Sequence, residues 1–250
     1  MTTLDFNCDL GEGCGNDAAI LPWISSASIA CGGHTGDATS MREAIARCLD
    51  HGVAIGAHPS FEDREYFGRR ALTLPPAAIE TSVRQQITAL AEHCTALGAP
   101  LRHVKPHGAL YNLAAHQRTI ADAIVRAIQS IDASLILYGL ANSCLTAAGE
   151  AAGLRVAHEV FAERAYDRNG QLAPRGTPGA VIESIETSLT QVRQLLRSGH
   201  VTARDGAQVP LRADTLCLHG DRADAPLFAR ALHEAITADH IHITAPFQPL

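Results

Sequence analysis

Acidic side chains follow the first apolar run of the sequence, within residues 7–13 (NCDLGEG). Side chains alternate along a strand, so Asn7 and Asp9 would point to the same side of it. Glycines flank Glu12 and allow the chain to turn sharply there. Asp9 could cap that turn, but its place beside Asn7 on an otherwise apolar strand favours a functional role.

Histidines follow the next two apolar runs. His34 lies in residues 31–37 (CGGHTGD), where a glycine-rich turn could present backbone N–H groups to an anion at the start of a helix. Asp37 is the expected N-cap of that helix. His58 lies in residues 56–60 (GAHPS), where the proline favours an extended turn. Both imidazoles are candidates to line a site.

Two adjacent arginines, Arg69 and Arg70, occur in residues 67–70 (FGRR). A guanidinium is well suited to pair with a carboxylate or a phosphate. A solvated loop or a subunit contact explains the two residues equally well, and the sequence leaves both interpretations open.

Lys105 is the only lysine among the 20 Lys and Arg residues of the chain. It ends a predicted buried strand in residues 104–112 (VKPHGALYN), two positions before His107. A lysine there could neutralise a phosphate or carboxylate as a point charge, or form a Schiff base if its pKa is lowered. The alternative is a structural ion pair with Asp9 or another carboxylate.

The last such motif, residues 217–221 (CLHGD), places His219 and Asp221 two positions apart. The pair could orient the imidazole or supply metal ligands. His34, His58, His107 and His219 could together bind a metal, although no HExxH spacing is present, so the metal ligands stay unknown. Other histidines are interpreted as surface or packing residues, including His51, His93, His116, His200, His233, His240 and His242.

The composition excludes several classes of protein. The chain has 250 residues and a formal net charge of −6, which argues against a nucleic-acid binder. It is 46% hydrophobic and 18% charged, so it is not disordered. No apolar run reaches the roughly 18 residues of a membrane span, and no signal peptide is visible. Seven cysteines without CxxC spacing indicate a reduced, cytoplasmic protein with mostly buried thiols.

Strand-like and helix-like segments alternate along the chain. Predicted strands are residues 4–8, 28–31, 53–57, 101–105, 135–139, 155–160 and 215–219. Predicted helices are residues 37–51, 76–97, 117–131, 142–152, 180–197 and 225–238. Such alternation indicates a parallel sheet with right-handed crossovers. Residues 165–178 are expected to form a long loop, and residues 199–212 a hairpin or excursion.

Polar or ionisable side chains follow six of the seven predicted strands, and Glu159, Glu163 and Arg164 are those of the sixth. An open doubly wound sheet gathers its site at one crevice, whereas a barrel collects residues from many strand ends around one mouth. We therefore expect a single-domain α/β protein spanning residues 1–250, a seven-stranded TIM-like (β/α) barrel with the long loop over its mouth.

No P-loop and no Gly-x-Ser-x-Gly motif occurs, so nucleotide would be handled by another geometry or another chain.

Several motifs together, in this order, resemble the LamB/YcsF family over nearly the whole chain. They are residues 5–13 (DFNCDLGEG), 29–37 (IACGGHTGD), 56–60, 67–70, 104–112, 159–175 (EVFAERAYDRNGQLAPR) and 217–221. One departure is Glu163, where the family commonly has Asp. The resemblance implies a barrel related to the glycoside hydrolase/deacetylase superfamily. It also implies a subunit of a bacterial ATP-dependent 5-oxoprolinase, which cleaves 5-oxo-L-proline to L-glutamate as ATP is hydrolysed to ADP and phosphate.

The family acts with two further subunits, B and C, so ATP could be bound together with these partners; a divalent metal remains open. A lactam is a poor electrophile, and phosphorylating its oxygen would make that oxygen a leaving group, so that water could attack the ring carbon. From residue type, we expect Lys105 on phosphate or substrate carboxylate, Asp9 as base, and His107 and His219 as proton donors or oxyanion stabilisers. Asp221 would orient His219. Expected substrate-binding residues are Asn7, Glu12, His34, His58, Arg69, Arg70, Glu159 and Arg164.

Three alternatives stay open at this point. A metal-dependent amide or polysaccharide deacetylase would place Asp9, His34 and His58 around zinc. A Schiff-base lyase would use Lys105. A non-catalytic scaffold subunit would carry a vestigial site.

Overall fold

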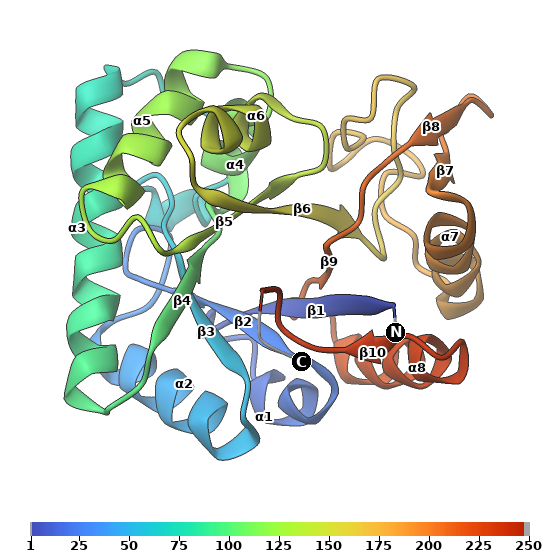
Figure 1. The fold of residues 1–250 in the computed structure, drawn as a ribbon, viewed down its shortest axis with the longest axis horizontal. Coiled ribbons are helices and arrows are strands. Elements are labelled where there is room, and N and C mark those ends of the chain that lie inside the picture. The colour runs from blue at the N-terminus through green and yellow to red at the C-terminus, as the bar shows by residue number, and fades with distance from the viewer. Residues whose placement is uncertain (1, 248–250) are drawn as a thin grey trace.

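Seven parallel strands form the centre of the structure, a computed structural model that describes residues 2–247. Neighbouring strands pair in chain order, and β9 pairs with both β6 and β1, so the sheet closes into the predicted barrel (Figure 1). The barrel strands are β1 (Thr3–Leu10), β2 (Ser26–Ala30), β3 (Ala54–His58), β4 (Leu101–Val104), β5 (Ile136–Leu140), β6 (Arg155–Phe161) and β9 (Thr215–Leu218).

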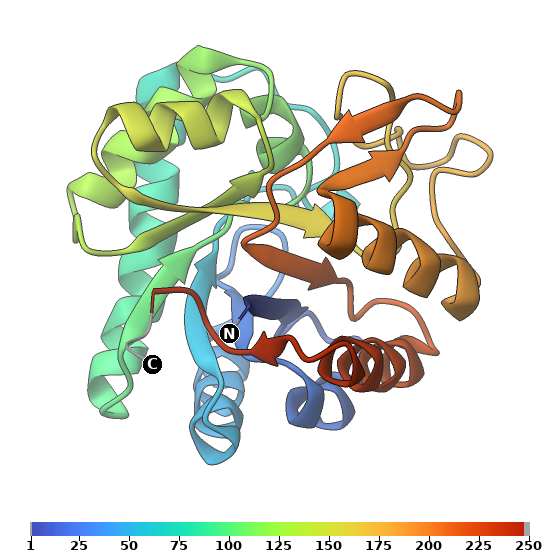
Figure 2. The same cartoon turned by 45° about the vertical axis from the view of Figure 1, so that its right-hand side comes forward.

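Helices connect the strands and cover the outside of the barrel, with α3 and α5 on one side and α7 and α8 on the opposite side (Figure 1, Figure 2). The helices are α1 (Asp17–Ile20), α2 (Ala38–His51), α3 (Pro76–Ala96), α4 (Gly108–Ala114), α5 (Arg118–Gln129), α6 (Cys144–Ala151), α7 (Ile185–Ser198) and α8 (Ala225–Ala238), with short 3-10 turns η1 (Leu21–Trp23) and η2 (Arg64–Tyr66). Among residues 2–247, none of these helices combines the length and apolar character that crossing a membrane requires.

Local sequence signals explain the ends of α2. Asp37 is its N-cap, as predicted, and accepts hydrogen bonds from the backbone N–H groups of Thr39 and Ser40. The Ser40 side chain in turn accepts from the backbone of Asp37, which completes a capping box. The helix ends at Gly52, whose left-handed φ of 67° is readily adopted by glycine.

Two predicted helices begin later than expected. The helix predicted from residue 180 starts at Ile185, because Val181 pairs with Arg164 in an isolated β-bridge and the Ser184 hydroxyl caps the first turn. The helix predicted from residue 142 starts at Cys144, because Asn142 has a left-handed φ of 58°. In both cases local side-chain or bridge interactions satisfy the backbone outside the helix.

Residues 199–212 contain the predicted hairpin, formed by β7 (His200–Thr202) and β8 (Gln208–Pro210). The hairpin turn contacts the long loop of residues 165–178 through ion pairs of Arg204 with Asp167 and of Arg168 with Asp205. The two segments lie together beside the barrel (Figure 2). A last strand that the sequence did not indicate, β10 (His242–Ile243), pairs with the first residues of β1.

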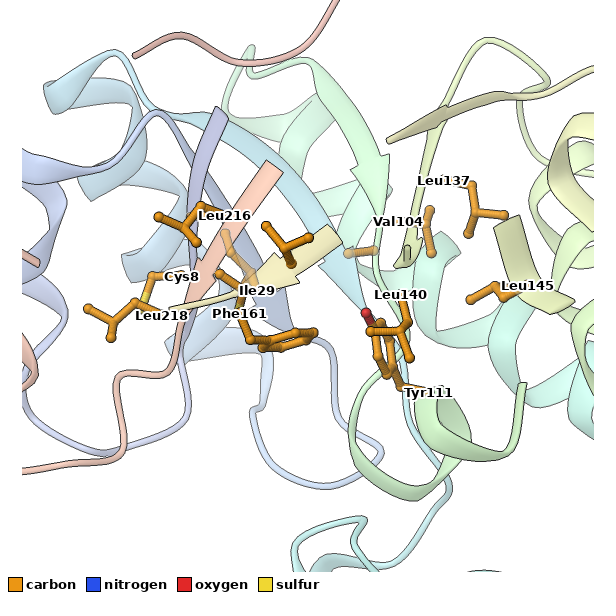
Figure 3. Close-up of a cluster of buried hydrophobic side chains, with 14 of the residues drawn as sticks. Cys8, Ile29, Val104, Tyr111, Leu137, Leu140, Leu145, Phe161, Leu216 and Leu218 are labelled. Atoms are coloured by element: carbon orange, nitrogen blue, oxygen red, sulfur yellow. The ribbon is translucent and has the colours of Figure 1, made fainter. Parts of the chain in front are cut away.

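The hydrophobic core lies between the barrel and its helices (Figure 3). The even-numbered residues of β1 pack in this core, whereas Asp5, Asn7 and Asp9 form hydrogen bonds or ion pairs with side chains of other barrel strands and strand ends. Asp5 accepts hydrogen bonds from three hydroxyls: Ser25 at 2.7 Å, Ser26 at 2.8 Å and Thr215 at 2.5 Å. Burial raises the pKa of Asp5, and these hydrogen bonds limit the rise. The interior of the barrel is therefore polar.

His103 lies in this polar interior, where it stacks on Tyr138 with 4.2 Å between ring centroids and bonds Ser28 at 3.2 Å. Burial lowers the pKa of His103 to about 3. Gly56 provides the space for the ring, since a Cβ on Gly56 would lie 2.1 Å from ring atoms of His103.

Gly56→Ala is expected to lower the free energy of unfolding by about 1–3 kcal/mol, because the overpacked ring must move from its two partners. Urea denaturation measures the change. Gly139→Ala is the matched control, because a Cβ there comes no closer than 3.2 Å to its neighbours and should have a smaller effect. Equal stability of the two variants would contradict the packing argument.

All seven cysteines are free thiols, and five of them are buried, as the sequence predicted. Burial raises the pKa of the thiol of Cys31 to about 12 and of Cys94 to about 11. These thiols are therefore packing groups at neutral pH.

Candidate active site

Side chains that follow the barrel strands line one cavity of about 510 Å³. Residues 171–175, which belong to the predicted long loop, form part of its wall. The charged, aromatic and imidazole side chains that line the cavity are Asp9, His58, Arg69, Lys105, His107, Tyr111, His116, Glu159, Phe161, Arg164, Arg175 and His219. The other residues predicted for the site do not line it: Asn7, Glu12, His34, Arg70 and Asp221.

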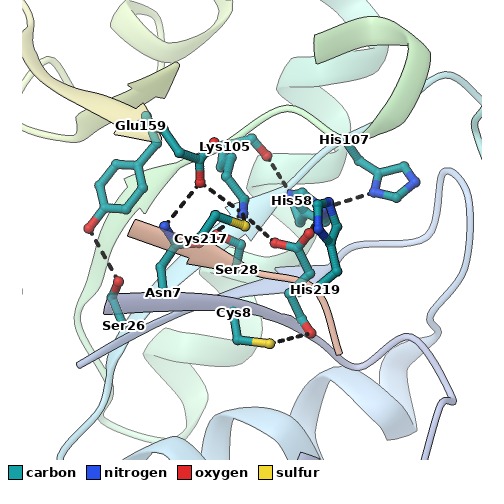
Figure 4. A network of polar contacts seen from close by, with 12 residues as sticks. Asn7, Cys8, Ser26, Ser28, His58, Lys105, His107, Glu159, Cys217 and His219 are labelled. Carbon is teal, nitrogen blue, oxygen red and sulfur yellow. Dashed lines mark hydrogen bonds and ion pairs between the residues drawn. The ribbon is translucent and has the colours of Figure 1, made fainter. Parts of the chain in front are cut away.

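Lys105 stands at the centre of a buried network (Figure 4). Its ammonium lies 2.5 Å from Asp9 Oδ1 and 3.2 Å from Glu159 Oε1, and it donates to Asn7 Oδ1 at 2.8 Å. The Cys217 thiol lies 3.4 Å away. An ammonium has three N–H donors, and these three oxygens are enough to accept all of them.

The charges of this network determine its protonation. Burial alone would lower the pKa of Lys105, but the charges of Asp9 and Glu159 outweigh it and raise the pKa well above its ordinary value. Burial alone would raise the pKa of Asp9, but His58 and the Lys105 ammonium outweigh it and hold the pKa well below its usual range. Both groups are therefore charged.

This geometry changes the roles expected for Lys105. The structural ion pair with Asp9 is present, and the ammonium has no N–H left over for a phosphate or a substrate carboxylate. A Schiff-base lysine must lose its proton, which requires a lowered pKa; the pKa of Lys105 is raised. The Schiff-base lyase is therefore disfavoured.

Asn7 and Glu159 bond each other as well as Lys105. The Asn7 amide donates to Glu159 Oε1 at 3.0 Å and to the Thr215 hydroxyl at 2.7 Å. Asn7 is fully buried beneath Lys105 rather than in contact with the cavity. The contacts of Asn7 are therefore with Lys105, Glu159 and Thr215 rather than with the contents of this cavity.

Two imidazoles beside Asp9 face each other, with 2.9 Å between His58 Nε2 and His107 Nδ1. The far nitrogen of each ring bonds a backbone carbonyl: His58 Nδ1 to Lys105 O at 2.7 Å and His107 Nε2 to Phe67 O at 2.9 Å. Burial, together with His58 and His34, lowers the pKa of His107 well below its ordinary value.

His34 and Glu12 complete this cluster behind the cavity wall. His34 Nε2 lies 2.9 Å from Glu12 Oε1, and the His34 ring stacks on His107 with 3.7 Å between centroids. Burial lowers the pKa of His34, although Glu12 opposes the shift.

Two groups of side chains bring possible metal ligands together: Glu12, His34, His58 and His107 in one, and Asp9, Cys217 and His219 in the other. The zinc set expected for a deacetylase, Asp9 with His34 and His58, is not assembled. Asp9 Oδ2 lies 3.4 Å from His58, but Oδ1 is paired with Lys105, and His34 is directed at Glu12.

His219 is oriented by Glu163, not by Asp221 as expected. Its Nδ1 forms a short hydrogen bond with Glu163 Oε1, and the ring stacks on Phe161 with 5.6 Å between centroids. Asp221 instead bonds Arg69 at 2.6 Å, because the turn after β9 carries its side chain toward that loop. A carboxylate that fixes an imidazole at a cavity wall is an arrangement suited to general acid–base catalysis.

Arg164 is a buried cation with no carboxylate within 4 Å among the described residues. Arg164 is 5% exposed, and its guanidinium donates only to the backbone carbonyls of Ala173 at 2.6 Å and Ala180 at 3.3 Å. Burial and the neighbouring charge of Arg175 lower the pKa of Arg164 to about 10. A desolvated cation of this kind favours an anionic ligand in the cavity.

Arg70 does not reach the cavity, because it pairs with Asp63 at 2.9 Å and lies over Tyr66. Arg70 therefore does not line this cavity, whereas Arg69 does. His116, interpreted as a surface residue, is exposed at the mouth of the cavity.

Two residues that the sequence did not single out, Tyr111 and Arg175, line the cavity. The Tyr111 hydroxyl is buried, borders the cavity and has no hydrogen-bond partner in the described structure. Both lie inside the quoted segments 104–112 and 159–175. Glu163 was noted as an ionisable residue after the sixth strand and as a departure from the usual Asp, but its bond to His219 was not expected.

Comparisons with known proteins show the family and the fold of this chain. A family model described as "LamB/YcsF family" matches residues 4–250. The 5-oxoprolinase A subunits of Bordetella pertussis and Bordetella parapertussis are each 48% identical over 97% of this chain and 98% of their own length. The crystal structure of a lactam utilization protein from Thermus thermophilus superimposes with a TM-score of 0.92 at 43% identity, covering 98% of this chain and 100% of that one.

Proposed function

Because this chain belongs to the LamB/YcsF family, we propose that it is the A subunit of a 5-oxoprolinase, an enzyme that opens the lactam of 5-oxo-L-proline to give L-glutamate with hydrolysis of ATP. The names of its Bordetella relatives support this proposal. The structural observation that carries it is the unpaired, buried Arg164 in the same cavity as the Glu163–His219 pair.

Arg164 and Arg175 suit the carboxylate of 5-oxoproline. Binding a carboxylate would give the buried guanidinium of Arg164 the counter-charge that it lacks. The cavity also offers Phe161 and Tyr111 as aromatic walls for a five-membered ring, and the unpartnered Tyr111 hydroxyl as a hydrogen-bonding group. Its volume of about 510 Å³ lies in the range of small-molecule sites.

Activation by ATP makes the lactam reactive. Transfer of the γ-phosphoryl group to the lactam oxygen releases ADP and leaves the ring carbon open to attack by water. Addition of water and protonation of the ring nitrogen then break the C–N bond. A second water hydrolyses the resulting acyl phosphate to L-glutamate and phosphate.

His219 is placed to move the protons of this sequence. Glu163 holds its Nδ1, and its Nε2 has no partner in the described structure, so it can accept a proton from the attacking water and return one to the ring nitrogen. The ionised Asp9, fixed by Lys105, is positioned to orient that water as a hydrogen-bond acceptor rather than to remove its proton, because a pKa held well below the usual range makes a weak base.

In this proposal, the steps of the reaction are divided between this chain and its partner subunits. No P-loop occurs in the sequence, so we assign ATP binding and the phosphoryl transfer to subunits B and C acting with this chain. Purified chain, incubated with 5-oxoproline and ATP, should release glutamate only when both partners are present. Absence of ATP-dependent glutamate release from the complete mixture would refute the proposal.

Arg164→Met is expected to raise the KM for 5-oxoproline about 10- to 100-fold with a smaller effect on kcat, since a charge-assisted hydrogen bond contributes roughly 1.5–3 kcal/mol. Steady-state kinetics of the complete enzyme measure both constants. Arg168→Met is the matched control, because Arg168 lies in the same loop but pairs with Asp205 at the surface. An unchanged KM in Arg164→Met would remove this residue from substrate binding.

A further inference from the structure

The hydrogen bonds of His58 and His107 determine where their protons lie. A backbone carbonyl can only accept a hydrogen bond, so His58 Nδ1 carries a proton toward Lys105 O, and His107 Nε2 carries one toward Phe67 O. In the neutral rings, His58 Nε2 and His107 Nδ1 are then the bare nitrogens. These two lone pairs face each other across 2.9 Å, an arrangement that repels unless a proton or a metal cation lies between them.

Carboxylate oxygens converge on the same point. Glu12 Oε1 lies 3.4 Å from His107 Nδ1 and 3.8 Å from His58 Nε2, and Asp9 Oδ2 lies 3.4 Å from His58 Nε2. The side chains of Glu12, His58 and His107 are each at most 6% exposed. Water therefore does little to screen the repulsion between these electron-rich atoms. Their close approach is stable only if a positive charge lies among them.

We propose that Glu12 Oε1, His58 Nε2 and His107 Nδ1 bind one first-row divalent transition metal ion of the zinc type. Ligands about 2.1 Å from such an ion in tetrahedral positions lie about 3.4 Å apart. The three donor atoms here are separated by 2.9, 3.4 and 3.8 Å. Two imidazoles and one carboxylate suit zinc, manganese or iron, whereas magnesium and calcium prefer sets made of oxygen.

The surroundings of these donors are those of metal ligands. A ligating histidine usually donates its other ring N–H to a carbonyl or carboxylate, which fixes the ring and its tautomer, and both imidazoles do so here. His58 and His107 also line the main cavity, so a bound ion would lie next to its contents.

His34 is a positioning residue for this site. It stacks on His107 with ring planes 3° apart, so both rings cannot direct an in-plane lone pair at one ion. His34 Nε2 instead donates to Glu12 Oε1 at 2.9 Å and holds the carboxylate toward the two imidazoles.

The test uses the full chain after treatment with a chelator, titrated with zinc chloride in a calorimeter. We expect one zinc ion per chain, and a loss of affinity of at least about 100-fold in Glu12→Gln and in His107→Ala. Loss of an outer partner weakens a metal site about 10- to 100-fold, so His34→Ala should show that loss, and His34→Gln, which keeps an N–H donor, should restore binding. His116→Ala, which removes an exposed imidazole at the cavity mouth, is the matched control.

Cobalt(II) provides a second readout that does not depend on the stability of any variant. The visible absorption of cobalt bound to the unmodified chain should indicate nitrogen and oxygen ligands, and zinc should displace it. Absence of stoichiometric binding of zinc, cobalt and manganese would overturn the proposal and leave a shared proton as the cation between the rings. Zinc affinity unchanged in Glu12→Gln would also overturn it. These measurements do not depend on turnover. A negative result would therefore refute the metal site without refuting the 5-oxoprolinase proposal, and a failed glutamate-release assay would leave the metal site standing.

Discussion

Lys105→Met is expected to lower the free energy of unfolding by about 3–5 kcal/mol, the usual effect of removing one partner of a buried ion pair. The methionine keeps the length of the side chain but leaves Asp9 and Glu159 as buried carboxylates without their shared cation. Urea denaturation measures the loss. Activity should fall to background in the same variant, because Asp9 would no longer be held ionised and oriented at the cavity.

A double variant separates lost charge from lost packing. Lys105→Met combined with Asp9→Asn removes the unpaired carboxylate, so its stability should exceed that of Lys105→Met alone. Strictly additive losses in the two substitutions would show that the pair is not coupled, and would contradict the role given to the network.

His219→Gln is expected to lower kcat of the complete enzyme about 100- to 10,000-fold with little change in KM, which is the typical contribution of a general acid–base group. The imidazole is 16% exposed and borders the cavity, so its replacement should leave the stability almost unchanged. Steady-state kinetics and a thermal melt together test this expectation.

Two carboxylates near His219 provide the control. Glu163→Gln should also lower kcat, because the neutral amide stabilises the protonated imidazole less well than the carboxylate that bonds it. Asp221→Asn should have a smaller effect, since Asp221 bonds Arg69 instead. A larger loss in Asp221→Asn than in Glu163→Gln would restore the role that the sequence suggested for Asp221.

The barrel and the place of its site were predictable because parallel strands bring their carboxyl ends to one mouth. Lys105, His107 and His219 could be located from that rule alone. The polar interior could also have been predicted from the sequence. Strand β1 contains Leu4, Asp5, Phe6, Asn7, Cys8, Asp9 and Leu10. Apolar and polar residues alternate strictly in it, which the interpretation of this segment as an apolar run overlooked.

The partners of the site residues were not predictable in the same way. Whether His219 meets Glu163 or Asp221 depends on how the turns after β6 and β9 carry two side chains relative to each other. Arg164 and Arg70 are both arginines in loops, and only the folded loop shows that one is buried against backbone carbonyls while the other pairs with Asp63. Such tertiary contacts leave no local pattern in the sequence.

The burial of Lys105 has a practical consequence for locating the partner subunits on this chain. Lys105 is 2% exposed and is the only lysine, so the surface presents no lysine amine to succinimide-ester cross-linkers. Cross-linking mass spectrometry with such reagents would return no lysine contacts from this chain even in a tightly assembled complex. Carbodiimide coupling through its 26 Asp and Glu residues is the chemistry that can map the interface.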